Sequence, residues 1–277
     1  FFEFYIEPLH FDEYIRFKGM SIDKQRENLY ENEIKLLLHS YLKTGGFVEA
    51  IDFDDITLQK YHKESLLERV IYKDIPDAFQ INSPDLLFRL LYIISSNPGM
   101  YLDYKSLGND LKVDQRTISN YISYLCRSLL LKKMYNFSTN RLTSEKKLKR
   151  VYFNNTGFIY ALNPEKYPLD LVIENFFAYS LKSHFFYRSP QKNEVDIIIS
   201  NDNKLLPIEI KIRNQIRAED IKNIRKFMKH FNAPDAVVIS KKHEEIKQFD
   251  NQRLFILPYW KYWSVHTTIQ KIIGMPA

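Results

Sequence analysis

Three ionisable side chains lie within two apolar stretches of the sequence, where charged groups are uncommon. Asp196 lies in the first stretch, and Glu209 and Lys211 lie in the second. Carboxylates are depleted in β-strands and costly to bury unpaired. Joined by a four-residue loop at 201–204, the two stretches form a hairpin in which Asp196 faces Glu209, with Cβ atoms about 4.5–5.5 Å apart.

Two facing carboxylates repel each other unless a positive charge lies between them. A divalent cation with oxygen ligands, Mg²⁺ or Mn²⁺, removes this repulsion. Lys211 is two residues further along the same face, where it can orient a water or neutralise negative charge developing on phosphorus. Glu174, in a preceding helix with apolar neighbours, supplies a third carboxylate. The pattern predicts a cation site on the hairpin with Asp196 and Glu209 as ligands, beside the Lys211 ammonium and within reach of Glu174.

The elements that position these side chains follow from hydrophobic periodicity and turn residues. They indicate an α/β unit over residues 157–277. Its predicted helices are 168–184, 218–231 and one from about 259, and its predicted strands are 185–189, 194–200, 205–213, 235–240 and 253–257.

Residues 83–156 show a different order of elements. A helix starts at Ser83, a short helix covers 104–111, and Asp114 caps a helix over 115–128. Strand-like runs at 129–137 and 149–155 follow. Three helices and a two-stranded hairpin are typical of a winged helix.

Residues 1–82 read as a helical region without visible chemistry. The first residues are a strand-like aromatic stretch, and Phe1 opens the chain as if it were cut from a larger protein. Ser21 is the expected cap of a helix running to about Leu42, where Gly45 and Gly46 end it, and a second helix is expected over 57–75.

The winged-helix region carries polar and basic side chains suited to DNA. One side of the helix at 115–128 can contact phosphates and base edges in a major groove. The wing between the two strands is basic, and cationic wings bind phosphate. The residues expected to contact DNA are Gln115, Arg116, Thr117, Ser119, Asn120 and Ser123 on the helix, with Arg141, Lys146, Lys147, Lys149 and Arg150 on the wing.

The helical Glu174 followed by Asp196 and the Glu209-x-Lys211 pair resembles the PD-(D/E)xK, or restriction-endonuclease-like, αβββαβ domain, with Val195 where the family name has Pro. This resemblance implies a metal-dependent phosphodiesterase in which Asp196 and Glu209 bind the metal, Lys211 is the catalytic lysine and Glu174 is an additional catalytic acid on the first helix. The order of GGFVEA, ERVIYKDI, the winged helix and KRVYFNNTGFIYAL resembles archaeal and bacterial AAA-type ATPases with a DUF4143-type C-terminal region. The resemblance implies a multidomain chain of mixed α and α/β class. It also implies an upstream ATPase module that binds ATP, with residues 1–82 as its helical remnant.

Composition limits the partners, the cellular setting and the ligands that are compatible with the chain. The net charge of +6 is compatible with a polyanionic partner such as DNA, and a single cysteine excludes an internal disulfide and favours a cytoplasmic setting. We find no apolar run that could span a membrane and no Gly-rich phosphate loop, so ATP is expected only in the upstream module. A homo-oligomer is compatible with the sequence.

Three interpretations of function stay open. In the first, the last domain is a metal-dependent nuclease. In the second, the same fold binds DNA or protein without catalysis and regulates the ATPase, since fold does not settle function. In the third, the chain is a protein-interaction scaffold. The Glu-x-Lys pattern alone also occurs on solvated sheet faces, the wing lysines suit solvent equally well, and many winged helices contact proteins.

Overall fold

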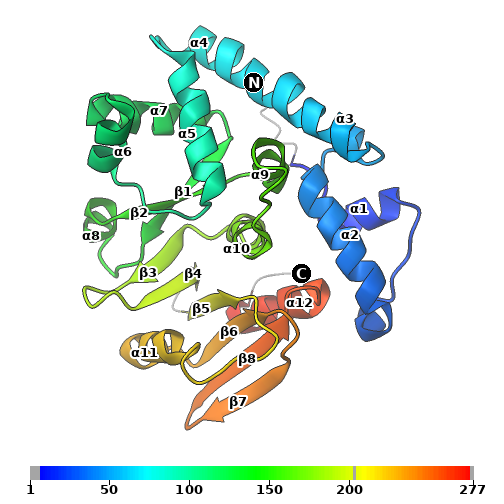
Figure 1. The fold of residues 1–277 in the computed structure, drawn as a ribbon. Helices are drawn as coiled ribbons and strands as arrows, with labels where there is room; N and C mark the ends of the chain where they lie inside the picture. Colours follow the sequence, from blue (N-terminus) through cyan, green and yellow to red (C-terminus); the bar gives the residue numbers. More distant parts are fainter. Residues whose placement is uncertain (1–6, 202–203, 275–277) are drawn as a thin grey trace, which may run out of the picture.

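The computed structural model describes residues 7–201 and 204–274, and Figure 1 shows their arrangement. The N-terminal region is helical. Its helices are α1 (Phe11–Phe17), α2 (Glu31–Thr44), α3 (Asp55–Lys60) and α4 (Ile75–Ala78), with 3₁₀ turns at Lys24–Tyr30 and Val48–Ala50 and wider i→i+5 turns at Tyr61–Glu68 and Val70–Asp74.

The predicted N-terminal helices differ in their limits. The first begins at Glu31 rather than after Ser21, because a 3₁₀ turn capped by Asp23 precedes it. It ends at Gly45, whose φ of 65° suits a residue without a Cβ. The predicted helix over 57–75 is confirmed and extends from Asp55 to Ala78 as one helical segment. The predicted strand-like start falls partly on residues 1–6, which lie outside the described residues, and residues 11–17 are helical.

The middle region has the predicted order of three helices and a hairpin. Asp114 caps α7 by accepting the backbone N–H of Arg116 at 2.7 Å, as expected. The elements are α5 (Pro84–Ser96), α6 (Tyr104–Leu111), α7 (Gln115–Arg127), β1 (Leu131–Asn136), α8 (Arg141–Lys146), β2 (Lys149–Phe153) and α9 (Thr156–Leu162). Helices α8 and α9 were not predicted.

The C-terminal region is α/β, as expected. Strand β7 was not predicted, since its mostly exposed and polar residues have no apolar face. The elements are α10 (Leu169–Ser180), β3 (Phe185–Arg188), β4 (Glu194–Asn201), β5 (Lys204–Lys211), α11 (Lys222–Phe231), β6 (Asp235–Ser240), β7 (Glu245–Phe249), β8 (Gln252–Pro258) and α12 (Tyr262–Ile273).

All eight strands described form one mixed sheet with the order β2-β1-β3-β4-β5-β6-β8-β7. The hairpin β1–β2 therefore continues the C-terminal sheet across the predicted domain boundary at 156. The junction is short: β1 pairs with β3 in parallel through Tyr135↔Phe185 and Asn136↔Phe186. The Asn136 side chain strengthens it by donating to the carbonyl of Arg188 and accepting from its N–H, both at 2.9 Å.

Helices cover both faces of this sheet (Figure 1). On one face, α10 and α12 pack against Ile197, Ile199 and Ile208 in a hydrophobic cluster that also includes the N-terminal helices. On the other face, α11 packs against Ile198 and Val238 in a second cluster. The alternation of strand residues between the faces explains why both faces are apolar.

Asn175 on α10 fixes the outer strand β2. Its fully buried side chain accepts the N–H of Phe153 at 2.8 Å and donates to the carbonyl of Phe153 at 2.9 Å. Both backbone groups lie on the side of β2 that has no neighbouring strand in the sheet order. The carboxamide therefore satisfies the edge of the sheet.

We expect Asn175→Ala to lower the free energy of unfolding by roughly 2–4 kcal/mol, because two buried backbone groups lose their partner. Urea denaturation measures this change. The matched control Asn109→Ala, on the exposed surface of α6, should stay within about 0.5 kcal/mol of the wild type. A loss of less than about 1 kcal/mol for Asn175→Ala would show that water replaces the carboxamide.

Candidate functional site

The pairing of β4 with β5 brings Asp196 and Glu209 to the same end of the hairpin. The predicted register is confirmed, because Ser200 pairs with Leu205 and the ladder continues back to Ile197↔Ile208. The paired residues end there, and the next hydrogen bond involves a side chain: Asp196 Oδ2 accepts the backbone N–H of Ile210 at 2.9 Å. One carboxylate oxygen of Asp196 is thus part of the sheet's hydrogen bonding.

An extra residue in β4 modifies the expected pattern of faces. Between β3 and β4 the register shifts, since Phe185 pairs with Ile198 but Tyr187 pairs with Val195. In a regular strand Val195 would share a face with Ile197 and Ile199, but it packs instead in the cluster beneath α11. Such bulges redirect side chains at functional sites, and this one lies beside Asp196.

Glu174 lies beside Asp196, as the sequence suggested. It is buried on α10, and its Oε1 accepts a hydrogen bond from the Tyr152 hydroxyl at 2.8 Å. Gly99 makes this approach possible, because a Cβ there would lie 2.9 Å from the Tyr152 ring and 3.0 Å from Glu174 Oε1. Its φ of +84° also suits glycine.

Arg150 bridges the two carboxylates. Its Nη2 lies 3.1 Å from Glu174 Oε1, and its Nη1 lies 3.4 Å from Asp196 Oδ1. Its Nε donates to the carbonyl of Gly99 at 2.6 Å. The side chain is 14% exposed. Three aromatic rings surround the guanidinium with centroids 5.6–5.8 Å away: Tyr101, Tyr152 and Phe186.

From the sequence, Arg150 is expected in the basic wing, without a connection to the carboxylates. The structure places it at the start of β2, directed inward. A signal was available in the sequence: Arg150 alternates with Val151 in a strand whose next residues, Tyr152 and Phe153, are apolar and aromatic. Residues of one parity in a strand share a face, so Arg150 and Tyr152 belong together.

Lys211 and Glu209 form an ion pair next to this bridge. Lys211 Nζ lies 2.5 Å from Glu209 Oε1, with the lysine side chain 30% exposed and the glutamate side chain 5% exposed. The second oxygen, Glu209 Oε2, is buried without a hydrogen-bond partner among the described residues. This oxygen can therefore accept a further hydrogen bond or bind a cation.

Burial and mutual repulsion control the protonation of the cluster. Burial, with the charge of Asp196, raises the pKa of Glu174 to about 7 and that of Glu209 to about 8. Burial alone would lower the pKa of Lys211, but the charges of Asp196 and Glu209 more than reverse this and raise it.

The remaining predicted residues lie on the surface of the middle region. On α7, Gln115, Arg116 and Asn120 are exposed, and Thr117, Ser119 and Ser123 are partly exposed. On the wing, Lys147 is partly exposed, and Lys149 donates to the carbonyl of Glu145 at 2.6 Å. The side chains of Arg141 and Lys146 lie outside the described set. A shallow depression of about 410 Å³ joins the start of α7 to the wing and is lined in part by Lys105, Gln115, Lys147 and Lys149.

The arrangement does not fit a divalent cation as it stands. Asp196 uses one oxygen for Ile210 and the other for Arg150, and Glu174 Oε1 is shared by Arg150 and Tyr152. Over residues 7–201 and 204–274, no three His, Cys, Asp or Glu side chains come close enough together to hold a metal. Within the same residues, no helix is both long enough and apolar enough to cross a membrane.

Two family matches divide the chain. Residues 170–262 match the family described as Domain of unknown function (DUF4143), which confirms that part of the predicted resemblance. Residues 35–168 match a different family, Domain of unknown function (DUF8612). The boundary between the matches falls between α9 and α10, before the helix that carries Glu174.

Two relatives come from Methanocaldococcus jannaschii. One, "Uncharacterized protein MJ1544", is 24% identical over 279 residues, which cover 94% of this chain and 62% of the relative. The other, "Uncharacterized protein MJ1637", is 31% identical over 119 residues, or 42% of this chain and 24% of the relative. The chain thus spans less than two thirds of either relative. No solved structure matches significantly.

We compare the free energies of unfolding of the wild type and Glu209→Gln. As the pH rises from 4.5 to about 8, the wild type should lose stability relative to this variant. In the unfolded chain Glu209 loses its proton near the ordinary pKa of 4.5, whereas in the folded chain it keeps the proton up to about 8. The unfolded state then binds fewer protons, so rising pH favours unfolding. The expected relative loss is roughly 2–4 kcal/mol.

Urea denaturation across this pH range measures the difference, with Glu165→Gln in an exposed loop as the control that should follow the wild type. A pH-independent difference between the wild type and Glu209→Gln would mean that Glu209 is ionised throughout and balanced by Lys211.

Proposed function

We propose that this chain is a DNA-binding module whose nuclease-like carboxylate cluster is neutralised from within and does not cleave. One observation carries the proposal: the Arg150 guanidinium spans Glu174 and Asp196 at 3.1 and 3.4 Å, the place where a bound cation would otherwise balance them. The carboxylates and Lys211 keep the PD-(D/E)xK-like pattern, while the arginine supplies the charge.

The charges of the cluster support this interpretation. It contains three carboxyl groups and two cations, Arg150 and Lys211. Burial raises the pKa of Glu174 to about 7 and that of Glu209 to about 8, so protonation of these groups at neutral pH brings the charges of the cluster close to balance. A divalent cation would have to enter a balanced and buried site, and removal of Arg150 would leave Glu174 and Asp196 uncompensated.

The surface of the middle region supports a nucleic-acid partner. The net charge of the chain is +6, and the depression between α7 and the wing is lined by three lysines and two acids, Asp103 and Glu145. Polar side chains on α7 can contact phosphates and base edges, and the lysines suit phosphates. The helix–helix–helix–hairpin order supports the winged-helix assignment on which this orientation rests.

The resemblance to AAA-type ATPases suggests the setting in which such a module acts. We propose that it binds DNA on behalf of an ATPase module in the same protein. The match of residues 170–262 to DUF4143 supports the resemblance. In this setting a buried, charge-balanced cluster serves to hold the hairpin and the C-terminal sheet together.

A second candidate is a metal-dependent phosphodiesterase, and one observation favours it. Glu209 Oε2 is a buried acceptor without a partner among the described residues, next to an ammonium only 2.5 Å from the other oxygen. Buried acceptors are normally satisfied, so an unsatisfied one requires an explanation. If Arg150 withdrew, this oxygen and Asp196 would become available to a cation.

Calorimetry with Mn²⁺ separates the two candidates. We expect the wild type to show no saturable binding at millimolar Mn²⁺, because Arg150 already balances the carboxylates. Arg150→Gln, which removes the charge and keeps a polar side chain, should bind Mn²⁺ and lose this binding when Asp196→Asn is added. Stoichiometric binding by the wild type, abolished by Asp196→Asn alone, would overturn the proposal and favour the phosphodiesterase. Thermal unfolding first confirms that each variant is folded.

We expect the chain to bind duplex DNA with a strong dependence on salt. Removing one phosphate contact by Arg116→Gln should reduce the slope of log affinity against log salt by about 1. Fluorescence anisotropy with a labelled duplex measures this slope. The control Lys166→Gln removes the same charge from an exposed loop outside the α7 surface and should leave the slope unchanged. Equal effects of both substitutions would indicate a general charge effect and argue against the α7 surface.

A further inference from the structure

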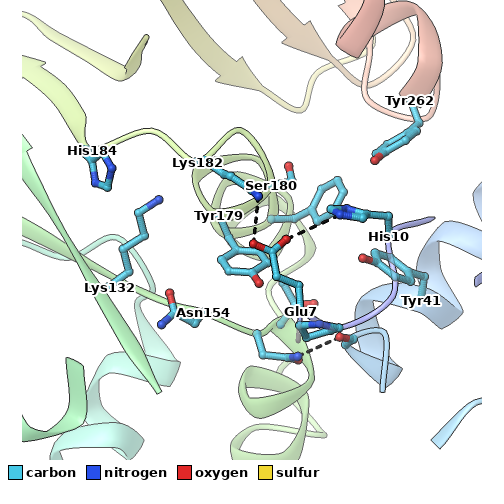
Figure 2. Close-up of a pocket in the computed structure, with 15 residues that line it drawn as sticks. Glu7, His10, Tyr41, Lys132, Asn154, Tyr179, Ser180, Lys182, His184 and Tyr262 are labelled. Atoms are coloured by element: carbon cyan, nitrogen blue, oxygen red, sulfur yellow. Dashed lines mark hydrogen bonds and ion pairs between the residues drawn. The ribbon is translucent and has the colours of Figure 1, made fainter. Parts of the chain in front are cut away.

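A separate cavity lies at the end of α10, away from the Arg150 cluster. Its volume is about 300 Å³, near the lower end for small-molecule sites. Several distant parts of the chain meet there, as Figure 2 shows: the segment before α1, α2, β1, the residues after β2, the end of α10 and α12. A cavity built from so many elements exists only in the folded chain.

One end of the cavity is cationic. Lys132 on β1 and His184 before β3 lie side by side at this end (Figure 2). Lys132 Nζ donates to the carbonyl of Ala178 at 3.1 Å, and an ammonium has two further donors. No carboxylate of the described residues lies within ion-pair distance of Lys132. Burial therefore lowers its pKa to about 8, and burial with the neighbouring charge of Lys132 lowers the pKa of His184.

The other end of the cavity is aromatic. Tyr41 and Tyr262 lie there together in Figure 2, and both contact the ring of Phe176. The ring centroid of Phe176 is 6.0 Å from that of Tyr41 and 6.3 Å from that of Tyr262. Such a cluster offers a surface on which a planar ring can pack.

Glu7, a carboxylate that lines the cavity, does not neutralise the cationic end. Its Oε1 lies 2.9 Å from Lys182 Nζ, and its Oε2 lies 3.6 Å from His10 Nε2. On the cavity wall, the buried Ser180 Oγ has no hydrogen-bond partner among the described residues. The cavity thus combines a cationic end without a counter-ion, an unused hydroxyl and an aromatic end.

We propose that this cavity binds a nucleoside monophosphate, with the phosphate beside Lys132 and His184 and the base against Tyr41, Phe176 and Tyr262. A phosphomonoester carries a charge of about −1.5 to −2 at pH 7, which the Lys132 ammonium offsets in part, and the His184 ring can donate a hydrogen bond to it. Packing of a base on an aromatic side chain contributes about 1–3 kcal/mol. This site is independent of the proposed DNA-binding function, because it shares no residue with the Arg150 cluster or the α7 surface.

Isothermal titration with AMP tests the proposal on the whole chain. We expect saturable one-to-one binding that weakens about tenfold or more in Lys132→Met, since a charge-assisted contact to the phosphate is lost. The matched control Lys133→Met changes the next residue of the same strand, which does not line the cavity, and should bind AMP like the wild type. Adenosine can contact only the aromatic end and inorganic phosphate only the cationic end, so both should bind more weakly than AMP.

His184→Ala provides a second variant that leaves the strands of the sheet unchanged, and we expect it to weaken AMP binding as well. The proposal is overturned if the folded wild type shows no saturable AMP binding at millimolar concentration, or if Lys132→Met and Lys133→Met bind AMP equally. Equal affinity for AMP and inorganic phosphate would reduce the site to a phosphate site and overturn the role of the aromatic end. Mn²⁺ and duplex DNA binding are measured separately, so failure here leaves the proposed function intact.

Discussion

The contact of Arg150 with Glu174 and Asp196 is the interaction on which the rest of the structure depends. It joins β2, α10 and β4, three elements that are distant in the sequence. Gly99 contributes the carbonyl that accepts the Nε hydrogen and, by lacking a side chain, the room for Glu174. The hairpin and the C-terminal sheet are therefore held together by buried charge as much as by backbone pairing.

Buried charge of this kind rarely adds much net stability. The free energy lost when the ions leave water is about as large as the free energy gained when they pair. The effect of this buried charge is on specificity, because Arg150 reaches both Glu174 and Asp196 only when the hairpin is correctly placed against the sheet. Tyr152 extends the same network by donating to Glu174. A cluster that resembles a hydrolytic site can thus be retained in a fold because it fixes how two parts of the chain meet.

Much of the fold could be predicted from local sequence, and the parts that could not depend on distant contacts. The alternation in β4 and β5 and the loop between them determine their register, and Asp114 indicates the start of α7. Strand alternation puts Arg150 on the same face as Tyr152, but the sequence does not show which groups that face meets. The partner that decides this, Glu174, lies 24 residues further along the chain.

The parallel pairing of β1 with β3 has a consequence for how the chain can be divided. The two family matches meet near residue 169, which suggests a natural place to separate the chain. In the folded protein β1 covers the edge of β3, and Asn136 binds both backbone groups of Arg188. A fragment beginning after α9 would expose this edge and leave Glu174 and Asp196 without Arg150. Exposed strand edges recruit other chains, so the isolated C-terminal part would be prone to self-association although it contains all the residues that match DUF4143.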